Sequence, residues 1–247
     1  MSCQLTGSAL AIFAVAVCVA CSSSPGRPAP DSAVVPPDEI VNFSVLYGQN
    51  CAGCHGMDGK GGAAIALANP VYLAIADDKV IRHTTANGVL GTPMPAFAQS
   101  AGGMLSDKQI DAVVGGIRSW AKPDAFGNQA VPTYAAQASG DPQRGAEVYR
   151  IYCSSCHGAG GHGGSKASSI VDGSYLALVS DQQLRTLVIT GRPELGAPDW
   201  RSDVEGRPMS AQDISDVVAW LSSQRPNFPG QPYPIASTTN PVNGGPR

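Results

Sequence analysis

The sequence is poor in the features that mark several large classes of protein. Charged residues make up 14% of its 247 residues and the formal net charge is −3, so it lacks the basic surface that nucleic-acid-binding proteins need. Aromatic residues make up only 6%, which is few for the core of a chain this long. No stretch alternates convincingly between apolar and polar residues, which argues against β-strands. We therefore expect an all-α protein with no nucleic-acid partner.

One long apolar run, residues 5–20, is too short for a comfortable membrane span but has the length of a signal-peptide core. We expect residues 1–20 to be a signal peptide that is removed on export. The sequence Val19-Ala20-Cys21, followed by serines, resembles the lipobox of bacterial lipoproteins. It departs from that pattern in having Cys18 at position minus three and no Lys or Arg before the apolar run. We expect Cys21 to carry a lipid, and an ordinary cleaved signal with a free thiol is the alternative.

The strongest feature of the sequence is the pattern Cys-x-x-Cys-His, which occurs at residues 51–55 and again at residues 153–157. It is the attachment signature of c-type haem, in which two thiols add to the porphyrin vinyl groups and the histidine binds the iron. Two intervening residues place both sulfurs on one helical turn, facing one porphyrin edge. The pattern predicts two covalently bound haem c groups. The attachment residues are Cys51, Cys54, Cys153 and Cys156, and the iron-binding histidines are His55 and His157.

Other uses of these cysteines explain less of the pattern. Structural zinc sites built from two Cys-x-x-Cys pairs separate the pairs by about 15 to 20 residues, far fewer than here. A thioredoxin-like site needs a single pair between a strand and a helix, and two disulfides would leave both histidines unexplained. A porphyrin also supplies a large flat apolar surface, so two small domains can close around haem with few aromatic residues.

The remaining cysteines agree with export. Four of the seven go to haem, Cys3 and Cys18 leave with the signal peptide, and Cys21 takes the lipid, so no spare thiol stays in an oxidising compartment. Residues 21–37 are rich in Ser, Pro and Ala and are expected to form the lipid anchor and a flexible tether. The predicted location is the periplasmic side of a bacterial cytoplasmic membrane.

The chain repeats itself at an offset of 102 to 104 residues. Tyr72-Leu73-Ala74 returns as Tyr175-Leu176-Ala177, and Leu105-Ser106-Asp107 returns as Met209-Ser210-Ala211. Each half begins with a short helix that leads into the haem motif, has a middle helix starting near Asp77 or Ser180, and ends with a helix behind a capping box. The final helices carry matching apolar stripes. The stripes are Ile110, Val113, Val114 and Ile117 in one half, and Ile214, Val217, Val218 and Leu221 in the other.

Each half resembles a class I cytochrome c domain, and the whole is similar to tandem dihaem cytochromes of the cytochrome c4 group. The resemblance implies domains at residues 38–120 and 141–224. Residues 121–140 between them are rich in Pro, Ala, Gly and Gln and are expected to form a linker, and residues 225–247 are expected to form a Pro-rich tail. The resemblance also implies that the first and last helices of each half cross beside the haem. Two position pairs fit this crossing, because a large residue faces a small one with the roles exchanged. They are Phe43 with Gly116, and Gly145 with Trp220.

The first half contains the distal methionine that the family places on the iron. Met94 lies between Pro93 and Pro95, whose fixed φ angles lower the entropy cost of holding a flexible thioether in place. We predict Met94 as the sixth ligand of the first haem. Met57 and Met104 are predicted to be packing residues.

In the second half Ala197 stands where Met94 stands in the first, although the following proline and an aromatic residue are retained. Three possibilities follow for the second iron. Met209 is the candidate sixth ligand, with a packing role like that of Leu105 as an even alternative. His162 would have to round the porphyrin edge and is more simply a surface residue. The third possibility is an open or water-bound iron.

Taken together, these features predict an electron carrier with no catalytic residues. The resemblance implies transfer between a quinol-oxidising donor and a terminal oxidase or reductase of a respiratory or photosynthetic chain. One alternative is a haem enzyme, or a gas- or peroxide-binding protein, that uses an open second iron. Another is a fixed subunit of a larger respiratory complex, which the Pro-rich tail would favour.

Overall fold

The computed structural model describes residues 35–122, 125–127, 129–202 and 204–226. The chain divides into two units, residues 1–39 and residues 40–247. The described part of the first unit contains one short 3₁₀ helix, η1 (Pro37–Glu39). The predicted signal peptide, the lipidation site Cys21 and the tail beyond residue 226 lie outside the described residues.

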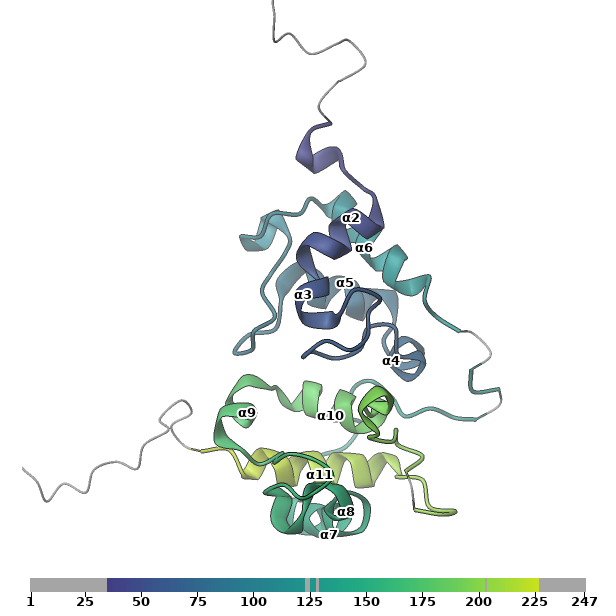
Figure 1. Ribbon diagram of the computed structural model, residues 1–247, viewed down its shortest axis with the longest axis vertical. Helices are drawn as coiled ribbons and strands as arrows, with labels where there is room; N and C mark the ends of the chain where they lie inside the picture. The colour runs from purple at the N-terminus through teal and green to yellow at the C-terminus, as the bar shows by residue number, and fades with distance from the viewer. Residues whose placement is uncertain (1–34, 123–124, 128, 203, 227–247) are drawn as a thin grey trace, which may run out of the picture. The chain divides into compact units, whose positions relative to one another are not determined.

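The second unit is helical, and the described residues contain only two isolated β-bridges and no strand. The prediction of an all-α fold is therefore confirmed. Its helices follow the same order twice (Figure 1). The first half contains α2 (Phe43–Asn50), α3 (Ala52–His55), α4 (Pro70–Ile75), α5 (Asp78–Asn87), η2 (Gln99–Ala101) and α6 (Asp107–Arg118). The second half contains α7 (Pro142–Tyr152), α8 (Ser154–His157), η3 (Ala159–Gly161), α9 (Gly173–Leu178), α10 (Asp181–Thr190), η4 (Pro193–Leu195) and α11 (Ala211–Ser223).

Local sequence sets where these helices begin. Both predicted capping boxes form: the Ser106 N–H donates to Gln109 Oε1 at 3.0 Å, and the Ser210 N–H donates to Asp213 Oδ2 at 2.9 Å. Each box satisfies backbone donors that the first helical turn would otherwise leave free. The last helix of each half is thereby fixed at its N-terminal end.

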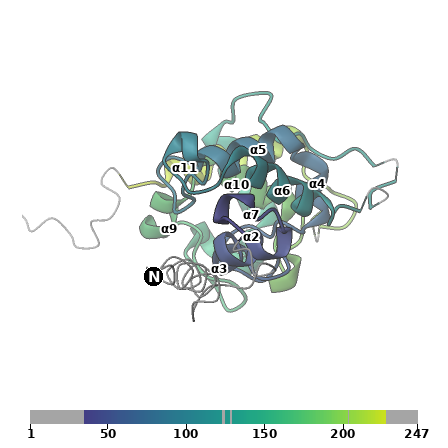
Figure 2. The same ribbon diagram turned by 90° about the horizontal axis from the view of Figure 1, so that it is seen from above.

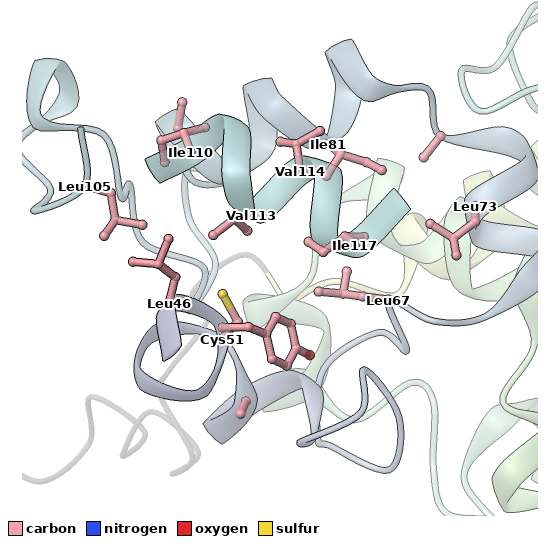
Figure 3. Packing of buried hydrophobic residues seen from close by; sticks show 14 of the residues in the cluster. Leu46, Cys51, Leu67, Leu73, Ile81, Leu105, Ile110, Val113, Val114 and Ile117 are labelled. Atoms are coloured by element: carbon pink, nitrogen blue, oxygen red, sulfur yellow. The ribbon is translucent and has the colours of Figure 1, made fainter. Parts of the chain in front are cut away.

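The core of the first half forms around the predicted stripe of α6 (Figure 3). Ile110, Val113 and Ile117 are at most 2% exposed and pack with Leu46 of α2 and Ile81 of α5. Burying one such aliphatic side chain stabilises the fold by about 1.5–3 kcal/mol. The stripe therefore binds the first, middle and last helices of this half together.

The predicted exchange of large and small residues at the helix crossings is confirmed. In both views α2 lies against α6, and a Cβ atom added at Gly116 would stand 2.0 Å from the Phe43 ring (Figure 1; Figure 2). In the second half α7 packs on α11, and a Cβ atom at Gly145 would stand 2.7 Å from Trp220 Cβ. Each glycine lets its helix approach the partner helix closely enough to contact the facing aromatic residue, which is partly buried in both halves.

The two halves also touch each other through α4 and α10 (Figure 1). Val71 of α4 is 3% exposed and belongs to the apolar cluster of the second half, where Ile75 packs beside it. The Asn69 side chain, which caps α4, donates to the Thr190 carbonyl at the end of α10, 3.2 Å away. The halves thus share a buried boundary within the second unit.

The linker contributes to this boundary through Tyr134. Its ring packs against the core of the first half. Burial raises the pKa of its hydroxyl, and the side chains of Thr84 on α5 and Thr186 on α10 oppose this rise. Its backbone carbonyl accepts hydrogen bonds from Gln182 and Arg185. A segment predicted from composition alone as a linker therefore fills a specific position between the middle helices.

Within the part of the chain that the structure describes, no helix is both long and apolar enough to cross a membrane.

Candidate haem sites

The first motif forms the turn that the pattern predicts. Cys51 precedes α3, and Cys54 and His55 lie within it, so the three side chains come from one helical turn. Gly56 ends this turn with φ of +81°, and a Cβ atom there would stand 1.7 Å from the Lys60 carbonyl oxygen. Only glycine fits this position, since the loop returns directly over the motif.

The His55 ring is held in one orientation by the backbone. Its Nδ1 lies 2.8 Å from the Ile65 carbonyl oxygen, which can only accept, so Nδ1 carries the proton and the lone pair of Nε2 is free. Burial lowers the pKa of His55, against the opposing effect of the Ile65 hydrogen bond. A neutral imidazole with Nε2 free and Nδ1–H bonded to a carbonyl is the arrangement that metal-binding histidines use.

The two thiols of the first motif differ in their surroundings. Cys51 is 7% exposed and its sulfur points into the core beside α6, whereas Cys54 is exposed (Figure 3). Burial, and then the neighbouring Cys54, raise the pKa of Cys51 to about 11. Both cysteines are free rather than joined in a disulfide. The pair is therefore available for two thioether bonds, one at the core and one at the surface.

The second motif repeats this geometry. Cys153 precedes α8, which contains Cys156 and ends at His157. His157 Nδ1 lies 2.8 Å from the Ser168 carbonyl oxygen, so Nε2 is again the free nitrogen. Burial, and then Cys156, raise the pKa of Cys153 to about 12, and both cysteines are free. At the end of the turn Gly158 has φ of +75°.

Sequence reasoning missed a tyrosine that braces each motif. The Tyr47 hydroxyl donates to the Gly56 carbonyl at 2.9 Å, and the Tyr149 hydroxyl donates to the Gly158 carbonyl at 2.6 Å. Both tyrosines lie on the helix before the motif and are 2% exposed. The repeat pairs these two positions in the sequence, but only the structure shows that each hydroxyl reaches over the motif.

The residues present fit covalently bound haem at both motifs. Each supplies two free thiols one turn apart and an imidazole whose Nε2 is free to bind iron. The part of the chain that the structure describes contains no group of three or more His, Cys, Asp or Glu side chains that could hold a metal ion. The assignment of individual residues to haem stays a prediction.

Met94 lies in the loop between α5 and η2 and is half-buried. Two hydrogen bonds fix its backbone. The Met94 N–H donates to Thr92 Oγ1 at 3.2 Å, and the Met94 carbonyl accepts from the Val89 N–H at 3.0 Å. These bonds and the two flanking prolines hold the loop in one conformation. The predicted role of Met94 as an iron ligand stays a prediction.

The other methionines lie in different surroundings. Met209 is 7% exposed and packs in the second-half core with Trp200 and Ile214. Its predicted ligation of the second iron stays a prediction. Met57 and Met104 are 72% and 77% exposed, so the packing role predicted for them is wrong. Both lie in loops, where no helix face carries the side chain into a core.

A family model described as cytochrome C oxidase, cbb3-type, subunit III matches this chain twice, over residues 38–115 and 140–221. The chain belongs to this family. Membership implies covalently bound haem c, in agreement with the thiol pairs and fixed imidazoles described above. The two matched segments each contain one Cys-x-x-Cys-His motif.

Curated relatives of this cytochrome are named cytochrome bc1 complex cytochrome c subunit. Those of Mycobacterium tuberculosis and Mycobacterium bovis are 24% identical to it over an alignment of 186 positions that covers 71% of this chain. The Mycobacterium leprae protein is also 24% identical, over 78% of this chain. The alignment spans 60% of the length of the first of these relatives, so they extend well beyond the matched part.

Two solved structures are similar at a lower level. A reducing HAO-like protein complex of Kuenenia stuttgartiensis matches 78% of this chain and 100% of its own, with 18% identity and a TM-score of 0.44. Thiosulfate dehydrogenase (TsdBA) from Marichromatium purpuratum matches 85% of this chain and 52% of its own, with 19% identity and a TM-score of 0.32. Likenesses this weak do not establish a common arrangement of the halves or a common activity.

Proposed function

We propose that this cytochrome transfers single electrons through two covalently bound haem c groups while tethered by a lipid at Cys21 to the periplasmic side of the bacterial cytoplasmic membrane. Its donor is a quinol-oxidising complex, and its acceptor is a terminal oxidase or reductase of a respiratory or photosynthetic chain. The observation that carries the proposal is the duplicated turn in which two free thiols accompany an imidazole with Nε2 free.

The chain's own residues hold and orient the two groups. Cys51 and Cys54 would form thioethers with the first haem, while His55, oriented by the Ile65 carbonyl, and Met94 would bind its iron. When bound, each haem supplies an iron that alternates between the ferric and ferrous states, and His/Met ligation favours a relatively high potential. Cys153 and Cys156 would likewise form thioethers with the second haem, and His157 would bind its iron.

The proposal includes no substrate and no catalytic residue. Electrons would enter and leave at haem edges near the surface, where the exposed Cys54 marks one edge of the first group. The boundary shared by α4 and α10 would keep the two groups at a constant separation. A lipid tether would raise the concentration of the carrier near membrane partners.

A second candidate is a fixed subunit of a respiratory complex. The name of the mycobacterial relatives, a cytochrome c subunit of a bc1 complex, favours it. A fixed subunit would copurify in constant ratio with its complex after mild detergent extraction. A carrier would separate from the complex under the same conditions.

The haem content of the full-length chain tests the core of the proposal. We expect two haems per chain by pyridine haemochrome assay and mass spectrometry of the wild type. The double variant Cys51→Ala/Cys54→Ala and its matched control Cys153→Ala/Cys156→Ala should each retain one. A wild-type chain with one haem would contradict the dihaem proposal.

Kinetics and fractionation test the remaining steps. Membranes that contain the quinol-oxidising complex should reduce the holoprotein rapidly on addition of quinol, and inhibition of that complex should stop the reduction. Cys21→Ala should release the protein from the membrane fraction. Reduction at the same rate with the complex inhibited would argue against this donor.

A further inference from the structure

The loops after the two middle helices are joined by the same backbone hydrogen bond. In the first half the Val89 N–H donates to the Met94 carbonyl at 3.0 Å. In the second half the Arg192 N–H donates to the Ala197 carbonyl, also at 3.0 Å. The bond spans five residues in both loops, so the backbone brings Ala197 to the position that Met94 occupies in the first half.

The glycines that end the two middle helices independently support the match of Ala197 with Met94. Gly88 has φ of +68° and Gly191 has φ of +60°. A Cβ atom added at Gly88 would stand 2.7 Å from the Met94 carbonyl oxygen, and one at Gly191 would stand 2.7 Å from the Ala197 carbonyl oxygen. The loop backbone therefore lies at the same distance from the glycine in both halves. At the residue that contacts the glycine, the first half has Met94 and the second half has Ala197.

The next hydrogen bond along the chain places Met209. The Leu105 N–H donates to the Phe97 carbonyl at 2.7 Å, and the Met209 N–H donates to the Trp200 carbonyl at 2.8 Å. Leu105 is 6% exposed and Met209 is 7% exposed, each in the core of its own half. Met209 thus occupies the position of a core leucine, and its backbone is pinned beside Trp200.

His162 lies in the loop that follows the haem-binding motif, not in the loop that matches Met94. It is exposed, and the N–H of the next residue, Gly163, donates to the His157 carbonyl at 2.8 Å. The loop that carries His162 is therefore hydrogen-bonded to His157, whereas Ala197 belongs to the loop that matches the Met94 loop of the first half.

We propose that the second haem, held as in the proposed function on which this inference rests, receives no sixth ligand from the protein and that its iron binds small diatomic ligands. Ala197 has a methyl group where Met94 has a thioether, and a methyl group cannot coordinate iron. Met209 would stabilise the second-half core by packing, as Leu105 does in the first half. The two haems of one chain would then differ in accessibility: the first closed by Met94, the second open.

Carbon monoxide titration of the reduced full-length holoprotein tests this proposal, after its haem content has been measured. We expect one CO bound per chain, and a ferric spectrum that combines a low-spin haem with a high-spin or water-ligated one. Ala197→Met should abolish CO binding and strengthen the methionine-to-iron charge-transfer band. Met94→Ala should raise the stoichiometry to two CO per chain.

Met209→Leu decides between packing and ligation, because it keeps the volume of the side chain and copies the residue at the equivalent position. We expect it to leave CO stoichiometry and spin state unchanged. The proposal is overturned if the wild type carries two haems but binds no CO, whether or not Met209→Leu then opens a site. A chain with a single haem would overturn the dihaem proposal and this inference together.

Discussion

The side-chain amide of Asn69 donates to the carbonyl of Thr190 across 3.2 Å, although 121 positions separate the two residues in the sequence. Both residues are buried, at 5% and 1% exposure. The Asn69 amide oxygen simultaneously accepts from the N–H groups of Val71 and Tyr72 at the start of α4. One side chain therefore caps a helix in the first half and holds the end of a helix in the second.

Asn69→Asp separates these two roles. Aspartate keeps the capping oxygen but loses the donor and points a carboxylate at the Thr190 carbonyl, so we expect a loss of about 1–3 kcal/mol in the free energy of unfolding. The control is Asp172→Asn at the equivalent cap of α9, which should change stability by less than about 0.5 kcal/mol, because Asn and Asp cap equally well. Urea unfolding measures both. Equal effects would show that the bond to Thr190 contributes nothing.

The adjacent glycines of α6 should respond to alanine in opposite directions. Gly116→Ala would drive a Cβ atom into the Phe43 ring, and overpacking of this kind costs about 1–3 kcal/mol. Gly115 has no atom within 4 Å of its missing Cβ, so Gly115→Ala should stabilise the helix by about 0.5–1 kcal/mol. Thermal unfolding of the two variants would check the sign of each change. A stabilising Gly116→Ala would mean that α2 can move away from α6 without cost.

Equivalent arginines on the two middle helices should differ in importance. Arg185 is 3% exposed and donates to the carbonyls of Tyr134 and Thr133 at 3.0 and 2.9 Å. Arg82 has a side chain that is 38% exposed and forms ion pairs at the surface. We expect Arg185→Ala to cost about 3 kcal/mol and Arg82→Ala about 0–1 kcal/mol. Similar losses on denaturant unfolding would contradict the structural role of the linker carbonyls.

Asp216 should make stability depend on pH. Burial by itself raises the pKa of Asp216, but the Asp141 N–H, then the Gln212 amide and then the Arg144 guanidinium lower it by more, so the folded pKa lies below the ordinary value. A carboxyl of this kind contributes stability that is fully present above its unfolded pKa of about 4 and is lost as the pH falls through the folded value.

We therefore expect the difference in unfolding free energy between wild type and Asp216→Asn to be largest near neutral pH and to shrink below about pH 4. Denaturant unfolding across this range measures it. Arg144→Ala is the control: its side chain is 58% exposed, so its loss should cost no more than about 1 kcal/mol. A difference that stays constant with pH would show that the Asp216 charge is not the stabilising feature.

Features encoded over a few residues were predictable from the sequence. The serine caps at Ser106 and Ser210 and the apolar stripes behind them depend on spacings of three and four residues, and both are present. The exchange between Phe43 with Gly116 and Gly145 with Trp220 was also predictable, because duplication supplies an internal comparison. The helical turns at the two Cys-x-x-Cys-His motifs belong to the same group, since each is encoded within five adjacent residues, whereas their binding of haem stays a prediction.

Contacts that join distant segments were not predictable in this way. Arg118 pairs with Asp78 at 2.6 Å and donates to the Leu73 carbonyl, but the matching arginine of the second half is Arg225, three positions beyond the repeat. Three residues are nearly one helical turn, so the two arginines reach equivalent positions in space. Aligning the two halves of the sequence does not pair them. The contacts of Tyr134 were not predicted for a related reason, because the linker has no counterpart in the repeat.

The aromatic and glycine positions at the two helix crossings have a consequence for how a duplicated chain reaches the right partner. If α2 crossed α11 instead of α6, Phe43 would meet Trp220 and the helices could not close. If α7 crossed α6, Gly145 would meet Gly116 and leave a void in the interface. Tandem copies are prone to misassembly between halves during folding, and exchanged helix pairs of this kind penalise it. The four residues would therefore favour the pairing of each first helix with the last helix of its own half.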